Sequence, residues 1–203
     1  MFGRGRIIRR VAMAGLAAAI LSLPGGGVAS AQPYQSVVRE GAEERAAERT
    51  RLFSFLARAP TESDARAVEQ EIWAFWLEAP NAEAAALMNE ALEKRAGHDH
   101  AGAEEVLDRL VELEPDWAEA WNQRATIRFF REDFEGSLSD IEEVLHREPQ
   151  HFGALAGQAI ILMRHGRFAT AQSILRRAVE IHPYLRERAM IVPAPGEGGE
   201  RKI

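Results

Sequence analysis

The chain has 203 residues, no cysteine and a formal net charge of −6, which comes from 25 basic and 31 acidic residues. Without cysteine it can form neither a disulfide nor a thiol catalytic centre. An acidic balance argues against nucleic acid, whose phosphates favour basic surfaces, and against binding an anionic lipid surface through general charge. We therefore expect no nucleic acid partner and no cofactor.

Residues 1–31 have the pattern of a secretory signal peptide. A basic start that includes Arg9 and Arg10 precedes the apolar run Val11 to Leu23, and the small residues Ala29-Ser30-Ala31 follow. That run of about 13 residues is too short for a membrane span, which needs roughly 20. We expect cleavage after Ala31, a periplasmic or secreted location, and no stable membrane insertion afterwards. General secretion is favoured over twin-arginine export, and an uncleaved anchor is the less favoured alternative. Removing four arginines changes the net charge from −6 to −10.

Residues 32–42 show no periodicity and are expected to be mobile. A helical pattern begins near residue 43, where Leu52, Phe53 and Leu56 form an apolar stripe that ends before Pro60. Thr61, three residues before Asp64, resembles a capping box and predicts the start of a second helix.

A repeat then dominates the chain. Pro115, Pro149 and Pro183 are spaced by 34 residues each time (149 − 115 and 183 − 149). Each unit contains two helical patterns. The turns that join them are so short that the two helices must be antiparallel. The expected helices lie near 82–96, 101–113, 117–131, 134–147, 152–165 and 168–181.

A 34-residue period with two helices per unit resembles the tetratricopeptide repeat (TPR) family. The family has large, small and aromatic residues at fixed positions and a closing proline. In the middle unit these positions are filled by Trp121, Ala125, Phe134, Ser137, Val144 and Pro149. The last unit supplies Leu155, Ala159, Phe168, Ala171, Ala178 and Pro183, and the first, more loosely, Leu87, Ala91, His100, Ala103, Leu110 and Pro115.

The resemblance implies an all-α protein, a right-handed α-solenoid of three TPR helix pairs with an N-terminal helical cap. The repeats span 84–117, 118–151 and 152–185. Residues 43–80 do not fit the repeat, and we interpret them as the cap because terminal units of stacked-helix proteins are often atypical. Residues 186–203 are expected to form a C-terminal cap and a disordered tail.

Two arginines depart from the family pattern. Arg124 and Arg128 lie one turn apart where the family usually has apolar residues. A buried arginine needs a partner, and counting across the hairpin places Asp140 closest to Arg124. We expect an Arg124–Asp140 ion pair. The functional alternative is that either arginine binds a ligand carboxylate.

Residues with catalytic or metal-binding potential are few. The cluster His98-Asp99-His100 contains ligand types for zinc-like ions but lacks a third ligand at helical spacing, and it falls in a turn. The histidines at 146, 151, 165 and 182 are expected to be surface residues near helix ends. No nucleophile motif is present. We expect neither an enzyme nor a metal protein; a metal-dependent envelope enzyme is the least favoured alternative.

The family resemblance also implies a binding groove, because the first helix of each pair lines a concave surface in TPR proteins. The implied groove residues are Met88, Leu92, Arg95, Glu119, Asn122, Thr126, Phe129, Ile160, Met163 and Arg164. The family's carboxylate-clamp pattern of Lys and Asn is absent, since Thr126 and no lysine follows Asn122 by one turn.

The expected function is therefore a non-catalytic scaffold that binds an apolar segment of another envelope protein in this groove, with Arg95 and Arg164 orienting it. Self-association is the alternative, with the groove or the open end of the stack filled by a second copy. The chain's own segment 43–58 could also occupy the groove.

Overall fold

The computed structural model describes residues 32–193, with side chains from residue 41 onward. The expected signal peptide, at 1–31, and the tail from 194 lie outside the described residues. The chain divides into two compact units, Met1–Arg39 and Glu40–Ile203, and all contacts described here lie within the second. The helices are α1 (Gln32–Ala57), α2 (Glu62–Trp76), α3 (Ala82–Ala96), α4 (His100–Leu113), α5 (Ala118–Phe130), α6 (Phe134–Arg147), α7 (Phe152–Arg164), α8 (Phe168–Ile181) and the 3₁₀ helix η1 (Arg186–Met190).

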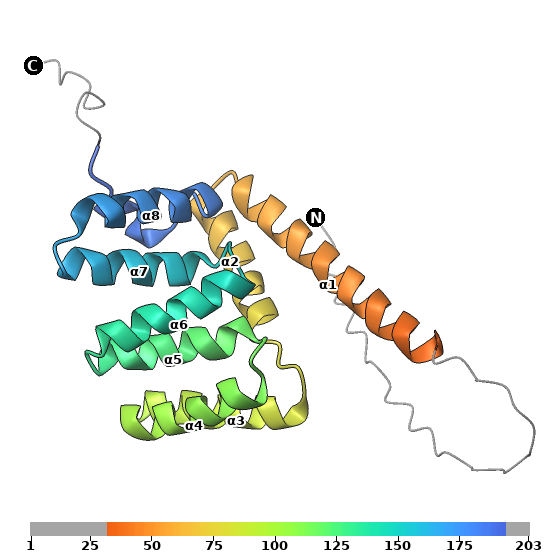
Figure 1. Cartoon of the computed structure of the whole chain (residues 1–203). Coiled ribbons are helices and arrows are strands. Elements are labelled where there is room, and N and C mark those ends of the chain that lie inside the picture. The colour runs from red at the N-terminus through yellow and green to blue at the C-terminus, as the bar shows by residue number, and fades with distance from the viewer. Residues whose placement is uncertain (1–31, 194–203) are drawn as a thin grey trace, which may run out of the picture. The chain divides into compact units, whose positions relative to one another are not determined.

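Three antiparallel pairs, α3/α4, α5/α6 and α7/α8, stack in chain order (Figure 1). Their bounds match the expected helices to within a residue, which confirms an all-α solenoid of helix pairs. At the start of the chain the expectation was wrong: α1 begins at Gln32, inside the segment 32–42 that lacks helical periodicity.

The turn inside each pair has the same backbone shape. His98, Glu132 and Gly166, which are 34 residues apart, all have a positive φ, of 61°, 62° and 71°. This left-handed conformation reverses the chain in two or three residues and is costly for any residue with a Cβ. Asp99 and Asp133 then cap the next helix, each accepting a hydrogen bond from the backbone three residues on.

Small residues let the two helices of a pair approach closely, as expected from the repeat. Ala159, Ala171 and Ala178 are completely buried between α7 and α8. In the middle pair the Ser137 hydroxyl donates to the carbonyl oxygen of Ala125 at 2.8 Å. The hydroxyl is thereby satisfied in the core, where an unpaired polar group would cost stability.

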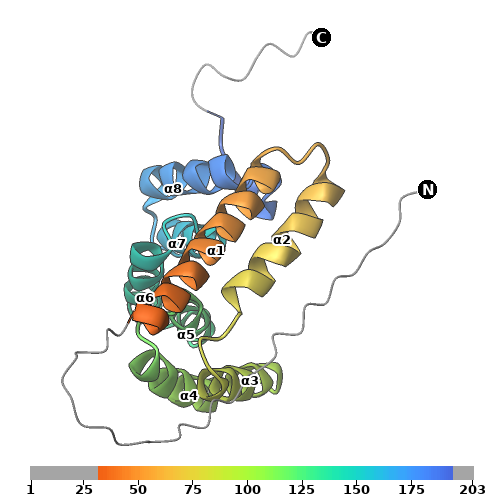
Figure 2. The ribbon, with the colours of Figure 1, turned by 90° about the vertical axis from the view of Figure 1, so that its right-hand side faces the viewer.

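The N-terminal helices, which we expected to form a cap from residues 43–80, share their buried cluster with the last repeat. Figures 1 and 2 show α1 and α2 beside each other, across the ends of the pairs where successive repeats are joined. Leu52, Leu56 and Ile72 share one buried cluster with Phe152 and Leu175 of the last repeat. The apolar faces of α1 and α2 are therefore buried mainly against α7 and α8.

Trp76 is the central contact of this crossing. Its ring stacks on His151 at 3.9 Å, its Nε1 donates to Glu148, and its carbonyl oxygen accepts from Trp117 Nε1 at 2.8 Å. Burial alone would raise the pKa of Glu148, but hydrogen bonds from Arg49 on α1 hold it below its usual value. The carboxylate therefore stays ionised and ties both α1 and α2 to the turn after α6.

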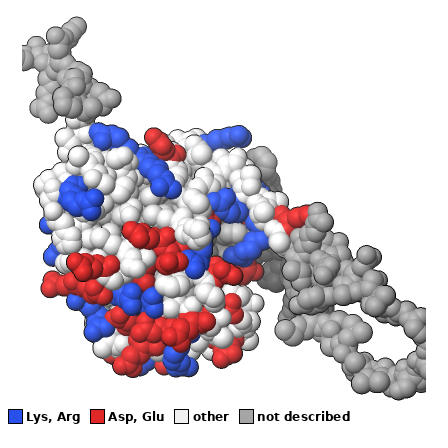
Figure 3. All heavy atoms as spheres, in the orientation of Figure 1, with Lys and Arg blue, Asp and Glu red and all other residues white. Residues whose placement is uncertain are grey.

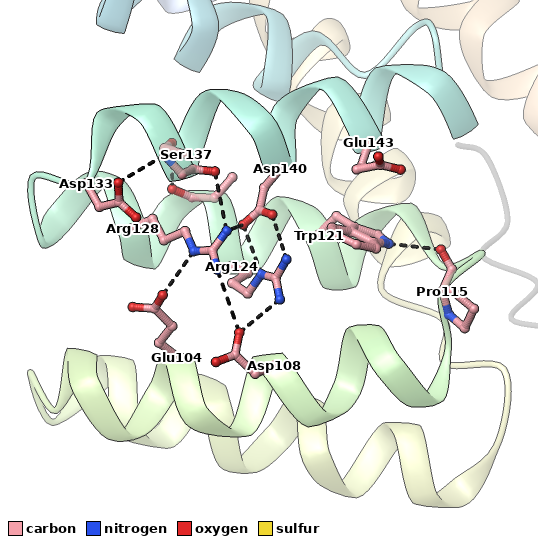
Figure 4. Close-up of polar contacts among 12 residues, drawn as sticks. Glu104, Asp108, Pro115, Trp121, Arg124, Arg128, Asp133, Ser137, Asp140 and Glu143 are labelled. Atoms are coloured by element: carbon pink, nitrogen blue, oxygen red, sulfur yellow. Dashed lines mark hydrogen bonds and ion pairs between the residues drawn. The ribbon is translucent and has the colours of Figure 1, made fainter.

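The arginines of α5 lie in an ionic cluster shared by three helices (Figure 4). Arg124 donates to both oxygens of Asp140, at 2.8 and 3.0 Å, which confirms the expected pair. It also binds Asp108 of α4 at 2.9 Å. Arg128 reaches Asp140 at 3.0 Å and Glu104 at 2.9 Å.

Burial opposes the charged form of Arg124, yet its hydrogen bonds to Asp140 and Asp108 hold its pKa above the usual value. Both guanidinium groups thus face carboxylates of α4 and α6. This arrangement favours a structural role over the alternative of a ligand clamp, and it fixes α5 between its neighbours.

Two histidines near helix ends are buried, which corrects the expectation of surface residues. His151 and His182 are 0% and 1% exposed. His151 caps α7: its Nδ1 accepts from the Ala154 amide at 3.1 Å, so the proton sits on Nε2, which donates to Glu119 at 3.1 Å. His182 packs against Phe152 with Nε2 3.4 Å from Glu69, and its buried Nδ1 has no partner. Both are covered because α2 crosses the turns where they lie.

The ionic cluster predicts that removing different carboxylates lowers the free energy of unfolding by different amounts. Asp140 is 2% exposed, so Asp140→Ala strands two partly buried arginines and should lower the free energy of unfolding by about 3 kcal/mol. Asp108 is 48% exposed, and Asp108→Ala should cost only about 0.5 kcal/mol. Urea denaturation of the two variants measures the difference. Equal effects would show that Asp140 is not the centre of the cluster.

His182 predicts a loss of stability in acid. Burial lowers its pKa below 6.5 despite the opposing effect of Glu69, so the unfolded state binds the proton more readily. The neutral His182 contributes fully to the free energy of unfolding above pH 6.5, and this contribution is lost as the pH falls through the lowered pKa. The loss is up to about 1.4 kcal/mol for each unit by which folding lowers the pKa. Unfolding should thus show less acid sensitivity in His182→Leu than in the unmodified chain. Parallel pH profiles would rule this out.

Candidate functional site

A groove of about 420 Å³ lies between the first helices of the second and third repeats. One wall is α5, with Asn122, Thr126, Phe129 and Phe130, and the floor behind it reaches Ile141 of α6. The volume is in the range of concave sites that hold ligands or anchoring side chains.

The opposite wall is α7, which presents small residues to the groove. Gly153, Ala156 and Gly157 are followed by Ile160 on the same helical face. A Cβ at Gly157 would meet only the Ile141 Cδ1, at 3.7 Å, so this wall borders open space. A Cβ at Gly153 would collide with the Trp73 ring at 2.7 Å, so this glycine is required by packing.

The polar groups of α5 at the groove are already hydrogen bonded. The Thr126 hydroxyl donates to the Asn122 carbonyl oxygen at 2.9 Å, and Asn122 Nδ2 donates to Glu119 at 3.1 Å. Glu119 also accepts from Gln123 at 2.5 Å and from His151, and it is 1% exposed. The groove therefore presents mainly apolar surface, with few free donors for an anionic ligand.

One end of the groove is formed by residues that sequence reasoning missed. Glu69 and Trp73 of α2 border it together with Leu185, the final residue of the last repeat, and with Arg186 and Glu187. Trp73 lies against His151 and Phe152 at the start of α7, with ring centroids 5.5 and 5.6 Å apart. Repeat periodicity gives no register for α2, so only the two tryptophans on one apolar helix face hinted at a specific packing role.

The predicted groove residues fall into two groups. Four of them line the groove together: Asn122, Thr126, Phe129 and Ile160. The other six do not line it: Met88, Leu92, Arg95, Glu119, Met163 and Arg164.

The six have other surroundings. Met88 is buried among α3 and α4, with Leu92 packed against the same cluster. Met163 packs against the core formed with α8. Arg95 Nη1 donates to Gln123 at 2.6 Å and so ties α3 to α5, while the Arg164 guanidinium lies over the Phe134 ring. No residue of 43–58 lines the groove either, so the alternative in which this segment occupies it has no support in the described structure.

Other site types have little support in residues 32–193. No group of three His, Cys, Asp or Glu side chains gathers there as a metal site would need, and His98 and His100 lie as a stacked pair with ring centroids 6.1 Å apart. Within the same residues, no helix has the length and apolarity to cross a membrane.

Comparison with protein-family profiles finds no match. A protein of Rhizobium etli described as a TPR repeat-containing protein is 37% identical over 132 residues. The match covers 65% of this chain and 65% of that relative, so the chain spans just under two thirds of the relative's length.

Two solved structures of yeast Sti1 domains share the arrangement of helices. The TPR2B domain, solved in complex with pHsp70, has a TM-score of 0.51 and 17% identity over 55% of this chain and 91% of that one. The TPR2AB domains, in complex with pHSP90, give a TM-score of 0.50 and 18% identity, covering 66% and 54%. The fold of the described repeats is therefore that of tetratricopeptide repeat domains, and the named relative supports the same family.

Proposed function

We propose that this chain is a small exported bacterial protein of the TPR family that binds other proteins without catalysing a reaction. It acts as a scaffold in the cell envelope, and its partner is another envelope protein. Three things support the proposal: the leader pattern of residues 1–31, the TPR fold, and relatives of that fold solved as protein complexes.

The groove between α5 and α7 is the observation that supports a binding site. Its walls are apolar, and the polar groups of α5 within it are satisfied by the protein itself. Binding a charged tail there would leave charge without partners, which is costly in a desolvated site. An apolar segment instead gains free energy from the surface it removes from water, about 25 cal/mol for each Å². The occupant is therefore an apolar helix or strand of the partner.

The end wall restricts how that segment enters. Trp73 lies across the start of α7, while the other end of the groove reaches Phe130, which is 53% exposed at the end of α5. The partner segment enters from the Phe130 end and meets Trp73. Arg186 and Glu187 at the edge of the groove, rather than Arg95 and Arg164, supply the charged contacts that orient it.

Gly157→Leu tests this site because it fills the groove with little disturbance to the fold. The added side chain projects into open space, and replacing a glycine inside a helix removes a cost of about 1 kcal/mol. Ser139→Leu is the matched control, since it places the same side chain at an exposed position of α6.

A photoreactive residue at Ile160, crosslinked in the native cell and followed by mass spectrometry, should capture a distinct envelope protein. We expect Gly157→Leu to reduce this capture at least tenfold, while Ser139→Leu leaves it unchanged and circular dichroism shows both variants folded. Undiminished capture in Gly157→Leu, or equal capture from a probe placed at residue 139, would show that the groove is not the binding site.

A further inference from the structure

The last repeat leaves a contact position uncovered that the other repeats cover. The first residue of the second helix recurs every 34 residues as His100, Phe134 and Phe168. His100 lies against Phe130 of the following repeat at 5.3 Å, and Phe134 against His165 at 5.5 Å. Up to residue 193, where the described residues end, no further repeat packs on Phe168, and its side chain is 62% exposed.

Two more apolar side chains extend this exposed surface. Gln172, one turn after Phe168, donates to the Met190 carbonyl oxygen at 2.9 Å and accepts from the Val192 amide at 2.8 Å. Met190 and Val192 therefore lie along the outer side of α8, where they are 42% and 62% exposed. We call Phe168, Met190 and Val192 the C-terminal patch.

Charge is divided between the two ends of the stack. Residues 152–193 contain six arginines and two glutamates, whereas residues 82–114 contain nine acidic and three basic residues. Figure 3 shows the same division, with blue prevailing over α7 and α8 and red over α3 and α4. Arg167, which is exposed, directly precedes Phe168 at the turn between α7 and α8.

The opposite end of the stack has complementary features. The outer side of α3 carries a stripe of exposed residues at helical spacing: Ala82, Ala86, Asn89, Glu90, Glu93 and Ala96. We call this the α3 stripe. It combines small apolar residues with two glutamates and includes no arginine or lysine, so it suits large apolar side chains flanked by arginines.

We propose that the protein assembles head to tail with itself, the C-terminal patch of one copy docking on the α3 stripe of the next. The second copy is the occupant because this chain itself supplies both halves of the match in charge and in side-chain size. A contact between two different surfaces is heterologous, so each copy keeps one of each free for further growth into a ring or a filament.

The assembly surfaces are separate from the proposed partner site. The groove is lined by α2, α5, α6, α7 and residues 185–187, and none of the residues of the C-terminal patch or the α3 stripe borders it. Assembly therefore leaves the groove open, and the two proposals can fail independently.

Analytical ultracentrifugation of the purified protein over a concentration series tests the assembly. The unmodified protein should form dimers and larger species as its concentration rises, and less so at high salt, because exposed charge pairs are screened. Phe168→Glu disables the C-terminal patch, and Glu90→Arg with Glu93→Arg disables the α3 stripe. Each variant alone should remain monomeric.

The mixture of these two variants is the decisive sample. Each retains the surface that the other lacks, so an equimolar mixture should form dimers and nothing larger. Phe55→Glu is the matched control, since Phe55 is 50% exposed on α1 outside both surfaces, and it should assemble as the unmodified protein does. An unmodified protein that stays monomeric, a mixture without dimers, or unimpaired assembly of Phe168→Glu would each overturn the proposal.

Discussion

The packing of Trp76 across the joints between repeats is the contact on which the described fold depends. This one residue touches the start of α5 through Trp117, the end of α6 through Glu148 and the start of α7 through His151. Three helix ends are thereby held against α2, which no pairwise stacking of repeats would achieve. Because α2 is fixed in this way, Trp73 lies over Gly153 and forms the end of the groove. The crossing of the N-terminal helices thus determines the shape of the site.

The two walls of the groove are held by different physical means. On the α7 side the support is aromatic and apolar, since Phe152 packs between Trp76 and His182. On the α5 side it is ionic, since Arg124 and Arg128 join the helix to α6 through Asp140 and to α4 through Asp108 and Glu104. Ion pairs of this kind fix which side chains face one another, because a displaced charge loses its partner in a poorly solvated place. The pairs therefore hold α5 at a fixed rotation, which keeps Thr126 and Phe129 turned to the groove.

Features that depend on residues close together in the sequence were predictable, and features that depend on contacts between distant segments were not. Helix ends, turns and the Arg124–Asp140 pair follow from a period of 34 and from counting across one hairpin, which are local relations. The position of α1 and α2 is not local: the stripe of Leu52 and Leu56 shows that these helices bury a face but not which surface covers it. His151 was expected at the surface for this reason, because a residue at a helix end is buried only if another element crosses it. The end of the groove that contains Trp73 was missed for the same reason.

The distribution of charge separates two kinds of recognition in one small chain. Charges on exposed surfaces act over about a Debye length, roughly 8 Å at physiological salt, so they favour approach between the oppositely charged ends of the stack. The groove has few charges and its α5 polar groups are satisfied internally, so selection there rests on shape and on apolar area. A partner that the acidic first repeat repels can still bind in the groove, provided that the segment it inserts is apolar and ends at Trp73. The fold therefore allows affinity to be set in the groove and spacing between copies to be set at the ends, without one altering the other.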